Sequence, residues 1–455
     1  MNLNVDNLLL PQRDHAVKIL DSLFLNGVAA DLSETGTGKT YVSAWVAKNL
    51  NVPIVVVCPK VVKRTWEGVL ANFGIKAHVV INYEKLMRGN TKFLTFKNGR
   101  DDNASFYELH LPKDSLVILD EVHKCKGWNS KNSDFLIALR QQRYKTLLLS
   151  ATAATNPMEM KSFGFATLLH NLTDFKKFIV DCGAYRTGRF GAFGIDLTSK
   201  NTQAAMRNIH TALFDTTNIA SRMTRDMFGS IFPDNRVIAD CFDMGSNTDK
   251  IQRVYDMMEA EIAALEENSN NYSEHIFAIM TKARRLAELL KVPTMVEMME
   301  DLYDEGISPV CFVNYTDTVE AIEKKLLRNP KMSNQIAKIV GGQTNKQRNN
   351  DIDDFQNNVK RVMIANLSAG NAGISLHDLK GNAPRHSLIS PSFSAIHLVQ
   401  ALGRIHRAEG KTPCIQKVVF AAGTIEEHAC RRVQARIDNI DQLNDGDLTS
   451  GIKIA

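Results

Sequence analysis

The 455-residue sequence lacks the patterns that mark several large classes of protein. Its seven cysteines are scattered and never form a CxxC pair, so neither a zinc knuckle nor a disulfide framework is indicated. No apolar stretch approaches the roughly 20 residues that cross a bilayer. The amino terminus, MNLNVDNLLLPQRD, carries an acidic residue where a secretory signal has basic ones, and no repeat or low-complexity tract occurs. These absences predict a globular cytoplasmic protein with no membrane segment.

Length and composition predict more than one folded core. A chain of 455 residues exceeds one ordinary core, and a hydrophobic content of 44% can fill two. The net charge of +5 allows a polyanionic partner without requiring one. Short β-branched runs alternate with helical patterns in two series, separated by a mostly helical middle at about 156–291. This arrangement predicts two α/β units with buried parallel strands. The runs begin at Pro53, Ala77, Ser115 and Thr146 in the first series, and at Pro309, Ile336, Arg361, His386 and Ile415 in the second.

A glycine-rich stretch, SETGTGKT, approximates a phosphate-binding loop. Gly36 and Gly38 let backbone amides turn toward phosphate oxygens, Lys39 would reach the β- and γ-phosphates, and Thr40 would bind Mg²⁺. Ser33 replaces the first glycine of the generic pattern, and a strand-to-helix turn without nucleotide is the alternative. The expected ATP contacts within the loop are Thr35, Gly36, Thr37, Gly38, Lys39 and Thr40.

A second stretch, SLVILDEVHK, supplies the acidic residues that such a loop needs. Asp120 follows four apolar residues and would hold Mg²⁺ through a water, while Glu121 would orient and deprotonate the attacking water. Two adjacent carboxylates can also form a solvated turn. Together with the lysine-containing loop, they favour nucleotide hydrolysis.

Three motifs then resemble those of superfamily 2 helicases. DEVH at Asp120–His123 resembles the DEAD/DEAH box, and SATAATN at Ser150–Asn156 resembles the third motif. QALGRIHR at Gln400–Arg407 resembles the sixth motif. The resemblance implies that Arg404 and Arg407 act as catalytic arginines at the γ-phosphate, reaching it across an interdomain cleft.

The order of motifs is most similar to that of the Swi/Snf-like translocases. LLLPQRDHAVKIL resembles their opening segment, which implies that Gln12 recognises adenine. VVVCPKVVKRTWEGVL at Val55–Leu70 resembles motif Ia. VMIANLSAGNAGISLHDL resembles motif V, which implies DNA-backbone contacts for Ser368 and Gly370 and an ATP-coupling role for Gly373.

Within that branch, the sequence is most similar to fork-remodelling annealing helicases. CGAYRTGRFGAFG at Cys182–Gly194 and the segment Ile219–Val237 resemble their insertion after motif III, although Met223 and Arg225 depart from the family pattern. The resemblance implies an α/β fold of two tandem RecA-like lobes with parallel sheets and a helical and loop insertion after motif III. The expected lobes are residues 1–235, with the insertion at about 160–235, and residues 236–455.

Basic residues near these motifs are candidates for phosphate contacts with DNA. They are Lys60 and Lys63 after the motif Ia strand and Arg186 and Arg189 in the insertion. A solvated helix start and an ordinary ordered loop are the respective alternatives. Interleaved aromatic residues of the insertion could stack on exposed bases.

The sequence therefore predicts an enzyme that uses ATP and Mg²⁺ to move on DNA, duplex or forked, in replication, recombination or repair. We expect DNA in preference to RNA, a monomer in a bacterial or phage-infected cell, and protein partners such as replication or recombination factors. The motifs leave little room for a histone-reading, nuclease or zinc module. The alternatives are a strand-separating DNA or RNA helicase and an ATP-switched regulatory subunit. Glu121 and the arginine pair argue against the switch, because a switch needs no complete hydrolytic set.

Overall fold

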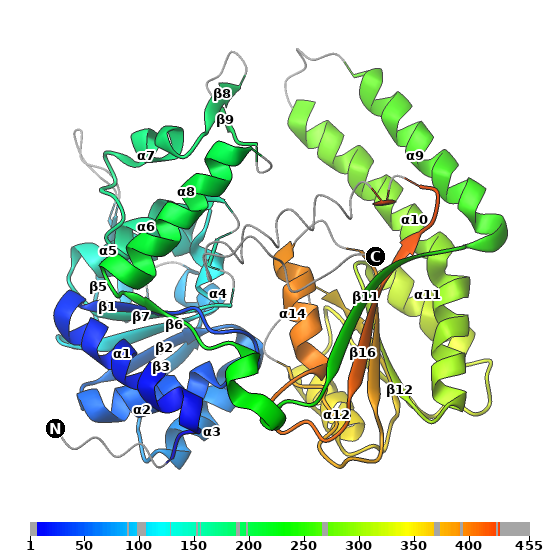
Figure 1. Ribbon diagram of the computed structural model, residues 1–455, viewed down its shortest axis with the longest axis horizontal. Helices are drawn as coiled ribbons and strands as arrows, with labels where there is room; N and C mark the ends of the chain where they lie inside the picture. Colours follow the sequence, from blue (N-terminus) through cyan, green and yellow to red (C-terminus); the bar gives the residue numbers. More distant parts are fainter. Residues whose placement is uncertain are drawn as a thin grey trace. The chain divides into compact units, whose positions relative to one another are not determined.

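The computed structural model describes residues 7–88, 91–97, 106–127, 129–151, 153–154, 156–187, 192–196, 199–265, 272–367, 374–391, 395–424 and 426–427. These residues divide into two compact units, and the chain passes from the first to the second between Gly229 and Ser230. Figure 1 shows both units as helices packed against a sheet.

The first unit is built on a parallel six-stranded sheet with the strand order β10-β1-β7-β6-β2-β3. Its strands are β1 (Val28–Asp31), β2 (Ile54–Cys58), β3 (Val79–Asn82), β6 (Leu116–Asp120), β7 (Lys145–Leu149) and β10 (Ala220–Ser221). Two antiparallel hairpins lie outside this sheet. One pairs β4 (Leu94–Lys97) with β5 (Phe106–Leu109), and the other pairs β8 (Tyr185–Thr187) with β9 (Ala192–Gly194). Its α-helices are α1 (Leu10–Asn26), α2 (Lys39–Leu50), α3 (Lys63–Asn72), α4 (Tyr83–Leu86), α5 (Lys131–Gln141), α6 (Lys161–Ala166), α7 (Phe175–Asp181) and α8 (Lys200–Thr211).

Helices cover both faces of this sheet, which explains its uniformly apolar strands. Alternate strand residues such as Val57, Val117 and Leu148 share a core with α5, α6 and α8. Helices α1, α2 and α3 lie on the opposite face (Figure 1). The connections β1-α2-β2 and β2-α3-β3 advance along the sheet in one direction, and β6-α5-β7 advances in the opposite direction. Because such crossovers are right-handed, the helices of the two groups lie on opposite faces of the sheet. The carboxyl ends of β1 and β6 therefore open onto one edge, where such sheets bind ligands.

The second unit has its own parallel six-stranded sheet, with the strand order β11-β16-β15-β12-β14-β13. Its elements are β11 (Asn235–Phe242), α9 (Thr248–Ala263), α10 (Tyr272–Asp304), β12 (Ser308–Val313), α11 (Thr316–Leu326), β13 (Ile336–Ile339), α12 (Asn345–Gln356), β14 (Val362–Asn366), β15 (Arg385–Ile389), α14 (Ala395–Ile405) and β16 (Cys414–Ala421). Helices α9, α10 and α11 share an apolar core with this sheet.

A buried carboxylate fastens α10 to the carboxyl end of β12. Glu288, only 2% exposed, accepts hydrogen bonds from the backbone amides of Asn314 and Tyr315 at 2.9–3.1 Å. It also accepts one from the Asn314 side chain at 2.6 Å. Since Tyr315 directly precedes α11, the carboxylate also lies favourably near the positive end of that helix.

The predicted parallel α/β architecture is confirmed. Every apolar run named above forms a strand of one of the two large sheets. The middle of the chain, predicted to be mostly helical, also contains the strands β8, β9, β10 and β11. Of these, β11 pairs with β16 along its whole length. Among the described helices, none is long and apolar enough to cross a membrane.

Candidate nucleotide-binding site

The phosphate loop lies between β1 and α2, as the sequence predicts. Gly36 and Gly38 have φ values of 87° and 90°, in the region that favours glycine. Gln12, on α1, donates a hydrogen bond from Nε2 to the carbonyl oxygen of Thr37 at 2.8 Å. A Cβ on Gly38 would overlap the same Nε2 atom. The loop therefore needs glycine at this position and is held from one side by α1.

The ammonium group of Lys39 lies at the centre of the loop. Its Nζ donates to the carbonyl oxygens of Ser33 at 2.7 Å and Glu34 at 3.0 Å. Its positive charge also acts to lower the pKa values of Asp31 and Asp120, the last residues of β1 and β6. Thr40 follows in the first turn of α2 and is half-buried.

A buried ion pair supports the start of the loop. His15 Nε2 lies 3.1 Å from Asp31 Oδ2, and the Ser33 amide donates to Asp31 Oδ1 at 3.0 Å. Burial by itself raises the pKa of Asp31, but the charges and hydrogen bonds of His15, Lys39 and Ser33 outweigh burial and lower that pKa overall. His15 Nδ1 also hydrogen-bonds Ser221 at 2.8 Å. Helix α1, β1 and β10 are thereby joined beneath the loop.

Asp120 lies at the carboxyl end of β6. Trp66 Nε1 donates to its Oδ2 at 2.8 Å, and the Tyr83 hydroxyl donates to its backbone oxygen at 3.0 Å. Burial, followed by the neighbouring charge of Glu121, raises the pKa of Asp120 to about 6, although Trp66 and Lys39 act in the opposite direction. The carboxylate is thus ionised at neutral pH, but its negative charge destabilises the folded protein when no cation is bound.

Glu121 has a backbone conformation that non-glycine residues seldom adopt. Its φ of 58° and ψ of 54° are left-handed and mark the start of a short 3-10 helix, Val122–Cys125. Such strain is commonly found at functional sites. Glu121 Oε2 lies 3.4 Å from His123 Nδ1, which also lies 3.3 Å from the hydroxyl of Ser150. These contacts link the DEVH motif to the SAT motif.

The donors on this edge suit a magnesium ion bound together with a nucleotide. Mg²⁺ is usually held by one or two carboxylates together with substrate phosphates and waters, so it needs no complete cage of protein ligands. One hydroxyl, Thr40, follows the phosphate loop, and one carboxylate, Asp120, ends β6. The raised pKa of Asp120 fits a carboxylate that is stabilised when a cation is bound.

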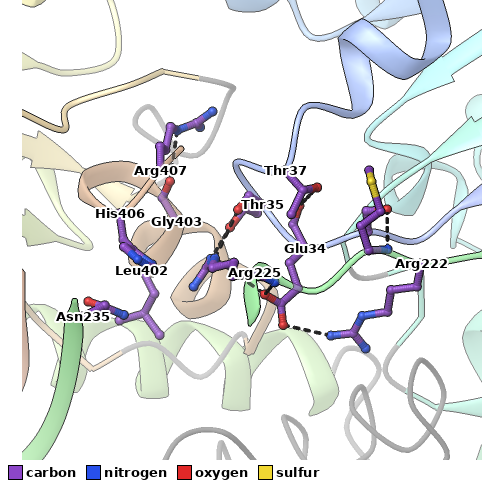
Figure 2. Close-up of polar contacts among 12 residues, drawn as sticks. Glu34, Thr35, Thr37, Arg222, Arg225, Asn235, Leu402, Gly403, His406 and Arg407 are labelled. Atoms are coloured by element: carbon purple, nitrogen blue, oxygen red, sulfur yellow. Dashed lines mark hydrogen bonds and ion pairs between the residues drawn. The ribbon is translucent and has the colours of Figure 1, made fainter. Parts of the chain in front are cut away.

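In the second unit, the two predicted arginines share one backbone partner. Arg404 Nη1 and Arg407 Nη2 donate to the carbonyl oxygen of Ile374 at 3.3 and 3.0 Å. Arg404 is only 2% exposed, on α14, while Arg407 follows that helix and donates Nε to Gly403 at 3.1 Å (Figure 2). Burial, then the charges of Arg407 and Arg385, lower the pKa of His377 to about 4, so its imidazole is neutral at pH 7.

The described candidates for nucleic-acid contact lie in the first unit. Lys60 is exposed, and Lys63 forms an ion pair with Glu67 at 3.4 Å. Arg186 and the adjacent Tyr185 are exposed on β8. Four predicted residues lie outside the described ranges: Arg189, Ser368, Gly370 and Gly373.

Three charged residues beside the phosphate loop were not predicted as part of the site. Glu34 accepts from Arg222 Nη2 at 3.2 Å and from the backbone amide of Arg225 at 3.0 Å. Arg225 Nη2 also donates to the hydroxyl of Thr35 at 2.7 Å. Figure 2 shows both arginine side chains turned toward the loop. The available signal was Arg222 within a segment that resembles a family insertion; Arg225 itself departs from the family pattern.

Comparisons with known proteins show which families the chain is similar to. The model of the helicase conserved C-terminal domain matches residues 290–409. A protein of Acanthamoeba polyphaga mimivirus, named "Putative ATP-dependent RNA helicase", is 30% identical over 457 residues, covering 96% of this chain and 83% of the relative. A "DNA repair and recombination protein RAD54-like" of Drosophila grimshawi is 23% identical over 70% of this chain, which spans 44% of that relative. The Sulfolobus solfataricus SWI2/SNF2 ATPase core in complex with dsDNA aligns over 97% of this chain and 94% of its own, with 17% identity and a TM-score of 0.37.

The chain belongs to the ATP-dependent helicases. It is an ATP-hydrolysing enzyme that acts on nucleic acid as a helicase or translocase.

Proposed function

We propose that this enzyme is a DNA translocase that moves along duplex or forked DNA. The observation that carries the proposal is the carboxyl edge of the first sheet, where Lys39, Asp120 and Glu121 meet the phosphate loop in a chain of this family. The Drosophila relative, named for DNA repair and recombination, supports DNA as the polymer and genome maintenance as the setting.

Each residue of the edge has a distinct proposed role. Lys39 binds the β- and γ-phosphates, while Thr40 and Asp120 hold Mg²⁺, which supplies charge neutralisation when it is bound. Glu121 orients and deprotonates the attacking water. Gln12, whose amide is already fixed to the phosphate loop, reads adenine.

The second unit contributes positive charge to the reaction. Arg404 and Arg407 stabilise the charge that develops on the transferred phosphoryl group. An arginine in this role contributes about 10³- to 10⁵-fold to the rate in well-studied cases. Their shared contact with Ile374 supports a joint action, because both guanidinium groups are held by one carbonyl group.

Contacts with DNA phosphates explain how such a motor works on any sequence. Lys60 and Arg186 are exposed and suited to such contacts. Tyr185, whose side chain is 55% exposed beside Arg186, could stack on a base at a fork.

Strand separation on DNA or RNA is the second candidate, and the mimivirus relative, named as an RNA helicase, favours RNA. The test is the rate of ATP hydrolysis without nucleic acid and with duplex DNA, single-stranded DNA, forked DNA or RNA, at one fixed salt concentration. Strong stimulation by duplex or forked DNA supports the translocase. Stimulation only by single strands or by RNA supports the unwinding helicase instead.

The Glu121→Gln variant is the control for this assay. It should still bind ATP, because glutamine retains the size of the side chain, but it should not turn ATP over. Undiminished hydrolysis would remove the role assigned to Glu121.

A further inference from the structure

The segment that connects the two units is attached to the phosphate loop by hydrogen bonds of its Met223 backbone. We call Ser221–Gly229 the connecting segment, because it follows β10 and ends where the first unit ends. The Met223 amide donates to the Ser33 hydroxyl at 2.9 Å, and the Glu34 amide donates to the Met223 carbonyl oxygen at 3.0 Å. These bonds place the connecting segment directly alongside the first residues of the loop.

Charged side chains reinforce the attachment. Arg222 Nη2 lies 3.2 Å from Glu34 Oε1, and Arg225 Nε lies 3.6 Å from Glu34 Oε2. Arg225 also donates from Nη2 and Nε to the hydroxyl and carbonyl oxygens of Thr35, at 2.7 and 3.3 Å. The side chains of Arg222, Arg225 and Glu34 are 9%, 21% and 30% exposed, so water screens these contacts only partly. Figure 2 shows the two arginines converging on the loop residues.

The position of Glu34 explains why a guanidinium group is useful here. Glu34 directly precedes the loop residues proposed to bind a triphosphate, so an uncompensated carboxylate would repel that anion. Arg222 and Arg225 together neutralise the carboxylate, and Arg225 also holds the loop through its hydrogen bonds to Thr35. Its contribution to nucleotide binding should therefore combine charge compensation with positioning.

The backbone of the connecting segment is kinked at its last residue. Gly229, its last residue, has φ 52° and ψ −128°, a combination that favours glycine. This kink lies four residues after Arg225, so the segment that Arg225 attaches to the loop ends at a fixed change of backbone direction.

We propose that Arg225 and Glu34 are positioning residues that couple the connecting segment to the phosphate loop and so set the affinity for ATP. The inference rests on the proposed binding of ATP at this loop. It assigns to Arg225 an effect on nucleotide binding that is larger than its effect on the chemical step, because Lys39, Asp120 and Glu121 remain in place.

The test measures binding and turnover separately in the full chain. The Kd of a fluorescent ATP analogue with Mg²⁺, and the KM and kcat of ATP hydrolysis, are compared among wild type, Arg225→Ala, Arg225→Lys, Glu34→Gln and the Glu34→Gln/Arg225→Ala double variant. Arg140→Ala is the matched control, because it removes an arginine of the same unit at the other end of the sheet from the phosphate loop. Arg140 lines a cavity of about 650 Å³ with Gly27 and Tyr144, at the amino ends of β1 and β7. A thermal melt of each variant confirms folding.

Arg225→Ala should raise Kd and KM about tenfold, the effect of losing one charged hydrogen bond, with kcat changed less than KM. Arg225→Lys should recover part of this loss. The double variant should bind more tightly than Arg225→Ala alone, because removing Glu34's charge removes the repulsion. A Kd for Arg225→Ala equal to that of Arg140→Ala, or a double variant weaker than both single variants, would overturn the inference. Failure of the wild type to bind the analogue would instead overturn the proposed ATP site.

Discussion

Replacement of Asp120 by asparagine should make the metal-free protein more stable while abolishing its activity. The carboxylate lies at the end of β6, next to Glu121 and with Trp66 as a hydrogen-bond donor. Burial and the charge of Glu121 raise the pKa of Asp120 from 3.8 to about 6. The folded protein therefore binds a proton at Asp120 more readily than the unfolded chain does.

The size and sign of the effect follow from this shift. About two pKa units correspond to about 3 kcal/mol, and partial exposure of Asp120 reduces the expected cost to about 2 kcal/mol. A raised folded-state pKa means that the penalty is absent below about pH 4, grows between pH 4 and 6, and is complete at pH 7. Asparagine removes the charge and keeps an oxygen that can accept from Trp66.

Thermal unfolding in EDTA provides the assay. The Asp120→Asn variant should unfold about 4–8 °C above the wild type at pH 7, and this difference should shrink toward zero near pH 4. Asp21→Asn is the control, since Asp21 is exposed on α1. ATP hydrolysis by Asp120→Asn should be lost. A variant that is less stable than the wild type at pH 7, or equally stabilised at pH 4 and pH 7, would refute the reasoning.

Three further predictions concern other contacts. Trp66→Phe removes the hydrogen-bond donor that lowers the pKa of Asp120, so the acidic side of the plot of kcat/KM against pH should move up by about one pH unit. An unchanged plot would contradict this role of Trp66. Glu288→Gln should lower stability to urea by about 1–3 kcal/mol, because the amide cannot accept all the hydrogen bonds from Asn314, and an unchanged midpoint would show that this contact is dispensable. Arg404→Ala should reduce turnover more than 100-fold while the ATP analogue still binds; loss of binding would assign Arg404 to nucleotide capture instead.

The sequence predicted those parts of the fold whose patterns are local. The β6 strand is a continuous apolar run that ends in Asp120, so both its buried position and its acidic carboxyl end were visible. The phosphate loop was equally clear, because Gly36 and Gly38 require positive φ between a strand and a helix.

Features that depend on distant contacts were not predictable in this way. β11 is an edge strand in which Ala239 is buried while most neighbours are partly exposed, so it lacks the continuous apolar run of the central strands. β10 has only two residues and is defined by pairing with β1. Arg225 meets Thr35 across 190 positions of sequence, and no local pattern encodes that contact.

Displacement of a third strand from a DNA triplex tests ATP-driven movement along duplex DNA most directly. The wild type should release the third strand only when ATP and Mg²⁺ are present, while the underlying duplex stays paired. The Glu121→Gln variant should release none. ATP hydrolysis that is stimulated by the duplex without release of the third strand, or release that needs no ATP, would contradict the claim.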